Sequence, residues 1–170
     1  MLRPTLRAAL ALLTALALPA CDSAGGEDQQ RFENAALLTV PSGFTRTDEA
    51  GAVVEADASD WQVGPAFGAR VRVLQVPFPN PAGADDVVSF TVDVDGLQGG
   101  LALYRLRADG VLEPFGTPET AYPDASRPGF YTFRFFGSEA TAAGVPGLYR
   151  LLLLNGRDRV VTYGDVRIDG

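Results

Sequence analysis

The sequence contains no histidine and no lysine, so all 14 of its basic residues are arginine. The absence of histidine excludes a Ser-His-Asp triad, a Cys-His pair and an ordinary zinc site, and one cysteine cannot supply the several thiolates of a structural zinc site. The absence of lysine excludes a Schiff base, a Ser-Lys dyad and a phosphate-loop lysine. Only carboxylate, tyrosine and arginine chemistry is left, and we predict no catalytic, cofactor-binding or metal-binding residue.

The chain also lacks a basic cluster, and its formal net charge is −7. Binding to nucleic acid needs a basic patch, so nucleic acid is not an expected partner. The arginines occur singly or in alternating pairs, Arg70/Arg72 and Arg105/Arg107. Alternation is the spacing of one strand face, and we interpret these pairs as solvated sheet faces. With a single cysteine no disulfide can form within the chain, so stability must come from a hydrophobic core.

Residues 1–20 have the layout of a secretory signal peptide. Residues 1–7 carry two arginines and no acid, residues 8–18 form an apolar run, and the small residue Ala20 directly precedes Cys21. The run is too short to span a bilayer, which takes roughly 20 residues. The alternatives are an ordinary signal peptide cut near a buried cysteine, or an amphipathic first helix, although the run leaves no polar face for such a helix.

The tetrapeptide Leu18-Pro19-Ala20-Cys21 resembles the lipobox of bacterial lipoproteins. The resemblance implies that Cys21 takes a diacylglycerol thioether, that the chain is cut after Ala20, and that the new amino terminus is acylated. The membrane is then a partner, and two or more acyl chains give a stable anchor. The expected location is the bacterial cell envelope; the outer membrane is favoured over the inner, and the protein would lie on its periplasmic face or at the cell surface. Loss of the two leader arginines takes the net charge from −7 to −9.

About 150 residues follow the leader, enough for one domain with its own core. Residues 21–34 are mostly small and polar, and are predicted to form a flexible acidic tether with a reach on the order of 20 Å. Residues 35–76 are predicted as N-terminal strands or an extended lead-in, and residues 77–170 as the main domain. Trp61 is the only tryptophan, and we interpret it as a plug in the core or at an edge.

From residue 35 onward the hydrophobic pattern is that of strands. Residues 88–94 alternate apolar with polar side chains, and residues 148–154 are nearly continuous apolar sequence, typical of a central strand covered on both faces. No segment shows a sustained helical stripe, and residues 139–143 are the only helix-like stretch. About seven short strands predict an all-β fold, an immunoglobulin-like antiparallel β-sandwich with an N-terminal extension.

Several residues are predicted to shape the ends and turns of these strands. Asp109-Gly110 and Asn155-Gly156 predict tight hairpins. Gly164, inside the last apolar run, is interpreted as a bulge. Tyr149 is interpreted as a tyrosine corner, whose hydroxyl bonds nearby backbone at the start of a strand.

Acidic residues give two weaker signals. Asp93-Val94-Asp95-Gly96 matches part of a calcium loop, but the other acidic ligands and the closing glutamate are missing at the required offsets, so a turn at a strand end is favoured. Asp85-Asp86 is interpreted as a solvated loop. Paired carboxylates can cleave glycosides, but the sequence does not show which acids meet in space.

Phe78-Pro79-Asn80-Pro81 opens a region that resembles the immunoglobulin-like C-terminal sorting domain of many secreted Bacteroidetes proteins. The resemblance covers about half of the chain and implies a β-sandwich and an address recognised by type IX secretion machinery. The prolines also have a plain structural role, because they fix φ and hold Asn80 extended. The other matching motifs are residues 88–94, Leu101-Ala102-Leu103-Tyr104 with Gly110, residues 129–135, and Gly147-Leu148-Tyr149-Arg150-Leu151.

The chain departs from that family in having Phe78 where tyrosine is usual, two long insertions, and an end without lysine. Together with Asp60-Trp61 and Tyr163-Gly164-Asp165-Val166, the same motifs also resemble small uncharacterised lipoproteins of the Rhodothermus and Salinibacter group. This second likeness implies no function.

The function that these patterns favour is a membrane-anchored, non-enzymatic structural or binding module. One alternative is a client or partner of type IX secretion machinery, and a less favoured one is a carboxylate-based envelope hydrolase. The sequence leaves open the ligand, an envelope protein partner, the membrane face and the oligomeric state.

Overall fold

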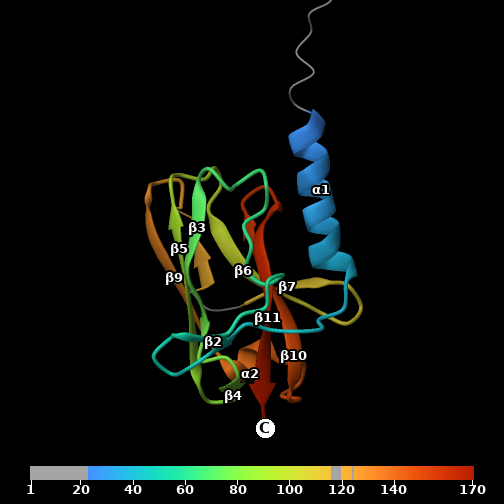
Figure 1. Ribbon diagram of the computed structural model, residues 1–170, viewed down its shortest axis with the longest axis vertical. Coiled ribbons are helices and arrows are strands. Elements are labelled where there is room, and N and C mark those ends of the chain that lie inside the picture. The colour runs from blue at the N-terminus through green and yellow to red at the C-terminus, as the bar shows by residue number, and fades with distance from the viewer. Residues whose placement is uncertain (1–22, 116–119, 124) are drawn as a thin grey trace, which may run out of the picture.

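Two β-sheets packed face to face form the body of the protein (Figure 1). The computed structural model describes residues 23–115, 120–123 and 125–170. The smaller sheet has the strand order β3-β5-β9, and the larger has the order β4-β11-β10-β6-β7 with β8 also paired to β6. The strands are β3 Val71–Phe78, β4 Ala82–Gly83, β5 Val87–Val94, β6 Leu101–Leu106, β7 Leu112–Pro114, β8 Ala121–Tyr122, β9 Gly129–Phe136, β10 Gly147–Asn155 and β11 Val160–Asp169.

The strand order is that of an immunoglobulin-type sandwich, in which the first, second and fifth strands share one sheet and the third, sixth and seventh share the other. β3 pairs antiparallel with β5, whereas β4 joins the larger sheet beside β11. The chain crosses between the sheets at Phe78-Pro79-Asn80-Pro81, where both X-Pro bonds are cis. The predicted immunoglobulin-like antiparallel β-sandwich is confirmed, with the two-residue β4–β11 pairing as a parallel exception.

Alternating side chains of the facing sheets fill the interior. On β5, Val88, Phe90 and Val92 are buried, and the residues between them are turned toward solvent. From β10, Leu151 and Leu153 join the same cluster. Full burial of each such side chain contributes about 1.5–3 kcal/mol, so this cluster is the main source of stability.

The segment predicted as a flexible tether is instead mostly helical, and this prediction was wrong. α1 (Ser23–Leu38) packs on the outer face of the larger sheet. Its inward positions are Gln29, Phe32, Glu33 and Ala36, spaced as on one helix face. Two of these four positions, Gln29 and Glu33, are polar, so the hydrophobic pattern of the sequence did not predict this helix.

α1 also explains the apolar sequence of β10. Leu151 and Leu153 face the sandwich interior, while Leu152 and Leu154 face the opposite way and pack with Ala36 of α1. The prediction of a central strand covered on both faces is therefore confirmed, and the second cover is a helix.

The predicted hairpins are present, but the predicted bulge is not where the sequence placed it. β6 and β7 flank Asp109-Gly110, and β10 and β11 flank Asn155-Gly156. Gly164 pairs in regular register with Leu151, and the register shift lies between Leu153 and Leu154. Gly164 is required for another reason, because a Cβ there would overlap the indole of Trp61. α2 (Gly137–Ala140) overlaps the predicted helix-like stretch.

Between α1 and β3, residues 39–70 form a strap that crosses the edge of the larger sheet. The strap contains a small ribbon of β1 (Arg46–Thr47) and β2 (Val53–Glu55). It then follows β11, where the Trp61 N–H donates to the Tyr163 carbonyl at 2.7 Å and the Gly64 N–H donates to the Val161 carbonyl at 2.8 Å. β3 begins in the segment predicted as N-terminal strands or an extended lead-in, and the strand alternative is confirmed there, because β3 is a full strand of the smaller sheet. The sandwich therefore begins at Val71, before the predicted boundary at residue 77.

Candidate functional site

The residues predicted for lipid attachment, Leu18, Pro19, Ala20 and Cys21, lie outside the described residues. α1 begins at Ser23, two residues after Cys21 in the sequence. Acylation of Cys21 therefore stays a prediction, and the described residues offer two other features to consider: a buried polar cluster and an apolar groove.

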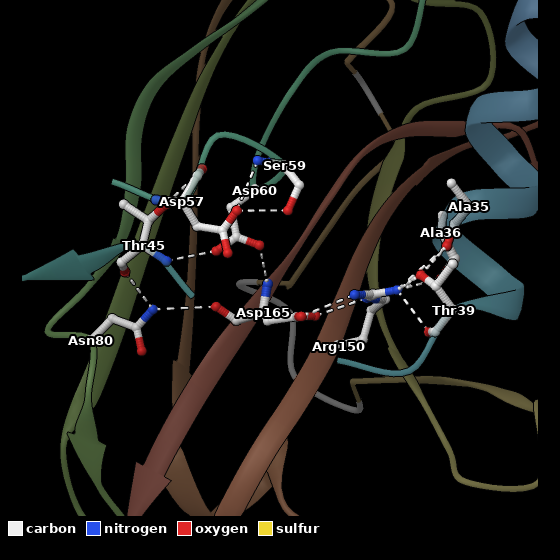
Figure 2. Close-up of polar contacts among 10 residues, drawn as sticks. All are labelled: Ala35, Ala36, Thr39, Thr45, Asp57, Ser59, Asp60, Asn80, Arg150 and Asp165. Atoms are coloured by element: carbon white, nitrogen blue, oxygen red, sulfur yellow. Dashed lines mark hydrogen bonds and ion pairs between the residues drawn. The ribbon is translucent and has the colours of Figure 1, made fainter. Parts of the chain in front are cut away.

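The buried polar cluster is centred on an ion pair between β10 and β11 (Figure 2). Arg150 and Asp165 lie opposite each other in the strand register, with side chains that are only 6% and 3% exposed. Arg150 Nε donates to Asp165 Oδ1 at 2.8 Å, and Nη2 donates to Oδ2 at 2.9 Å. This two-pronged geometry is the strongest form of an arginine–carboxylate contact.

The third nitrogen of Arg150 binds the C-terminal end of α1. Nη1 donates to the Thr39 carbonyl at 2.8 Å and to Thr39 Oγ1 at 2.6 Å, and it also contacts the carbonyls of Ala35 and Ala36 at 3.4 Å. Helix ends carry unpaired carbonyls and partial negative charge, which a cation satisfies. Arg150 therefore joins the helix to the sheet.

Asp60 and Asn80 tie the strap to the same place. The Asp165 N–H donates to Asp60 Oδ1 at 3.0 Å, and the Thr45 N–H donates to Asp60 Oδ2 at 2.6 Å. Asn80 is fully buried; its Nδ2 donates to the carbonyls of Thr45 and Asp165, and its Oδ1 accepts from the Arg167 N–H at 2.9 Å. The side-chain amide of Asn80 thus joins its own segment to the strap at Thr45 and to β11 at Asp165 and Arg167.

Burial makes the two carboxyl groups of this cluster hard to ionise. Removal from water raises the pKa of Asp60 to about 7. The hydrogen bond from the Thr45 N–H lowers this pKa, and the neighbouring charge of Asp165 raises it further. Burial also raises the pKa of Asp165, and Arg150 opposes that rise. The charge of a third acid, Asp57, adds to the rise in both pKa values. The oxygens of Asp60 and Asp165 are already engaged by Arg150 and by backbone N–H groups.

We expect the free energy of unfolding to fall as pH rises from about 4 to about 7, and the Asp60 contribution to level off above 7. The folded-state pKa of Asp60, about 7, lies above the unfolded value of 3.8, so the carboxyl binds a proton on folding and its stabilising contribution is lost as pH rises through 7. Asp165 acts in the same direction. Chemical denaturation at a series of pH values measures this slope.

Asp60→Asn is expected to flatten the pH slope, because the amide does not titrate. It should also lower stability at every pH, since only one of its two terminal atoms can accept a hydrogen bond. Asp158→Asn is the matched control: Asp158 is exposed in the β10–β11 turn at φ 57, a conformation that asparagine accepts. Equal slopes for the two variants would contradict the assignment of the pH dependence to Asp60.

The second feature is an apolar groove of about 370 Å³ between the C-terminal end of α1 and the β6–β7 hairpin. Leu38 and Val40 lie on its helix side and are 78% and 82% exposed. Leu106 and Leu148 line the sheet side. Neither Asp60 nor Asp165 lines the groove, but the two features meet at Arg150 and Thr39, which line the groove and belong to the polar cluster.

The arginines of the groove wall already have acidic partners. Arg107 pairs with Asp109 at 2.9 Å, and Arg105 pairs with Glu113. The prediction of a solvated face is confirmed for the half-exposed Arg107, but it was wrong for Arg105, whose side chain is largely buried. Arg105 is largely buried because it lies on the same face of β6 as Leu103, and that face points into the sandwich. The wall of the groove is thus mostly apolar, and the charges of Arg105 and Arg107 are balanced by their carboxylate partners.

The other sequence predictions are placed as follows. Tyr149 donates its hydroxyl to the Val145 carbonyl just before β10, so the tyrosine corner is confirmed. Asp93 pairs with Arg72, and within the described ranges no three metal-ligating side chains gather. Asp85 and Asp86 are both exposed, so the prediction of a solvated loop is confirmed, and Asp86 Oδ2 also accepts from the Gly83 N–H at 2.7 Å and closes the β4–β5 turn.

No family model matches the sequence, and no curated protein matches it. Among solved structures, the chain is similar to a Niemann-Pick type C2 protein from Japanese carpenter ant, at 15% identity over 51% of this chain and 77% of that chain, with a TM-score of 0.29. A likeness at this level carries no argument about ligand or activity. In the described part of the chain, no helix is both long and apolar enough to cross a bilayer.

Proposed function

We propose that this protein is a lipoprotein of the bacterial cell envelope, anchored through acylated Cys21, and that its sandwich is a non-enzymatic binding module. The binding surface is the groove between α1 and the β6–β7 hairpin. The observation that carries the binding role is that the exposed side chains of Leu38 and Val40 are continuous with an apolar groove, because contiguous exposed apolar surface often marks a binding site.

The chemistry of the groove favours a small uncharged apolar ligand. Its volume of about 370 Å³ falls at the lower end of the range of about 300–1,000 Å³ that is usual for small-molecule sites. Arg105, Arg107 and Arg150 all have carboxylate partners, so no cation of the wall is left to recruit an anionic group. A non-enzymatic role is supported by the two adjacent acids, Asp60 and Asp165, which bind backbone and arginine and do not line the groove.

Leu38→Asp is expected to weaken binding of Nile red, a neutral apolar probe, by about tenfold, the factor that corresponds to 1.4 kcal/mol. The reason is that a carboxylate placed in the groove must lose water when the probe enters. Fluorescence titration measures the affinity. Leu74→Asp is the matched control, because Leu74 is also exposed, at 51%, but lies on β3 in the other sheet. Failure of the wild-type protein to bind, or equal losses in both variants, would contradict the groove as the site.

Anchoring is tested on full-length protein made in a bacterial host that processes lipoproteins. Intact-mass measurement is expected to show loss of residues 1–20 and addition of acyl groups, and the protein should float with phosphatidylcholine vesicles. Cys21→Ser is expected to abolish both the added mass and the flotation, since the thioether needs the sulfur. An uncut leader or an unmodified sulfur in the native protein would overturn the anchor.

A second candidate is a client of type IX secretion machinery. It is favoured by the sandwich and by the tyrosine corner of Tyr149, which are features that the sorting-domain resemblance implies. A fusion test must include residues 23–170. β3 is a strand of the smaller sheet, and α1 and the strap cover the larger one, so a shorter fragment would lack part of the fold. A reporter that carries this region and stays inside a host with the machinery would count against this candidate.

A further inference from the structure

The mode of attachment of α1 bears on how an acyl anchor would hold the domain. The N-terminal half of the helix is fixed by Gln29, which donates to the Val160 carbonyl at 2.8 Å and accepts from the Ala66 N–H at 3.1 Å. Glu33 Oε1 accepts from Arg159 Nε at 2.6 Å. Both side chains are buried, so undocking the helix would have to rehydrate and separate several polar partners at once.

The C-terminal half of α1 is fixed by a different contact. Arg150 binds the carbonyl of Thr39 at the end of the helix and is itself held by Asp165. Between the two attachments, Phe32 packs against Tyr163, with ring centroids 5.0 Å apart. The helix is therefore joined to the sheet along most of its length, unlike a flexible tether.

The direction of α1 places its first residue beyond one end of the sandwich. Gln29 contacts Val160, the first residue of β11, and Arg150 links the other end of the helix to Asp165, so α1 runs in the same direction as β11. Ser23 precedes Gln29 by six residues, and at 1.5 Å per residue the helix extends about 9 Å past the start of β11 (Figure 1). Cys21 precedes Ser23 by two residues in the sequence, a separation that even a fully extended chain spans in about 7 Å.

We propose that α1 is a rigid mount which fixes the orientation of the sandwich on the membrane. This inference rests on the acyl anchor at Cys21. The end that carries the β10–β11 turn and the β5–β6 loop faces the lipid headgroups, and the end that carries the C-terminus and the β4–β5 turn points away. The binding groove, beside the last turn of α1, is then held about 24 Å from the anchored end.

The charge of the two ends does not by itself select this orientation. The end near the anchor carries Arg157 and Phe130, which is 73% exposed at the start of β9, and such side chains fit the headgroup region. The same end also carries the exposed acid Asp158, and the far end carries Asp85 and Asp169. Anionic lipid repels acids at either end, so the docking of α1 has to set the orientation.

The experiment uses full-length acylated protein on phosphatidylcholine vesicles that contain lipid with a nitroxide on its headgroup. Because acylated Cys21 has no free thiol, an introduced cysteine is the only site that a fluorophore can label. Arg157→Cys is expected to lose most of its label fluorescence to the quencher lipid, and Asp85→Cys is expected to lose none. The long strands between these positions place them about 30 Å apart, at 3.3 Å per residue. Equal quenching at the two positions would overturn the rigid mount.

A flexible Gly/Ser insertion between Asp22 and Ser23 supplies the control, since it leaves both the anchor and the docked helix intact. With the insertion, the difference in quenching between the labels at positions 157 and 85 is expected to shrink. A difference that persists unchanged would show that surface contacts set the orientation, and it would contradict the role of α1. Protein that carries an unmodified Cys21 and does not float with the vesicles would instead contradict the anchor itself.

Discussion

Arg150→Met is expected to lower the free energy of unfolding by about 3–5 kcal/mol, the usual cost of leaving one member of a buried ion pair alone. The change removes both hydrogen bonds to Asp165 and leaves the carbonyl of Thr39 at the end of α1 without its partner. Methionine keeps most of the apolar stem, so the loss reports on the charged group. Chemical denaturation followed by circular dichroism measures it.

The control for this variant is Arg167→Met on β11. Arg167 pairs with Asp169 at 3.0 Å, but both side chains are about half exposed, and exposed pairs contribute about 0–1 kcal/mol. The double variant Arg150→Met/Asp165→Leu is expected to recover part of the loss, because no charge is then buried without a partner. Similar losses for Arg150→Met and Arg167→Met would contradict the assignment of Arg150 as the joint between helix and sheet.

Trp61→Ala is expected to cost about 3–5 kcal/mol, as large-to-small changes of buried aromatic residues do. The indole is 4% exposed, its ring lies 4.7 Å from that of Phe90 between centroids, and it covers the backbone of Gly164. Trp61 has φ 58, and alanine in its place keeps a Cβ, so the backbone conformation costs about the same in both proteins. The loss therefore measures packing.

Gly164→Ala tests the same contact from the other side. In the wild-type protein the added Cβ overlaps the indole of Trp61, and overpacking of this kind costs about 1–3 kcal/mol. In the Trp61→Ala background the same change is expected to cost almost nothing, so the double-mutant cycle should give a clear coupling energy. Gly68→Ala is the control, because a Cβ at Gly68 meets nothing within 4 Å. Additive effects of Trp61→Ala and Gly164→Ala would contradict direct packing between the two residues.

The strands and hairpins could be predicted from the sequence because their signals are local. Alternation over residues 88–94 marks a strand with one buried face, and Asn155-Gly156 marks a tight turn, whatever the rest of the chain does. β10 shows the limit of such signals. Its apolar run predicted that both faces are covered. The sequence did not show that a helix covers the second face, because the buried face of α1 includes the polar residues Gln29 and Glu33.

The polar cluster was not predicted from the sequence, although part of it left a signal. Arg150 and Asp165 are single charged residues inside two otherwise apolar strands, and the hairpin at Asn155-Gly156 brings those strands together. A charge in such a strand must find a partner, so this pair could have been expected. The positions of Asp60 and Asn80 could not, because each reaches β11 from a distant segment of the chain.

The sequence by itself determined the strand pattern, the turns, the sandwich and the absence of histidine and lysine chemistry, since these follow from local side-chain period and residue type. Only the tertiary structure decided that residues predicted as a loose tether form a docked helix, that Asp60 is buried beside Asp165, and that an apolar groove opens beside Leu38. The physical reason is that burial and pairing are properties of contacts between distant segments. A polar side chain such as Gln29 or Asp60 is solvated in one fold and essential to packing in another.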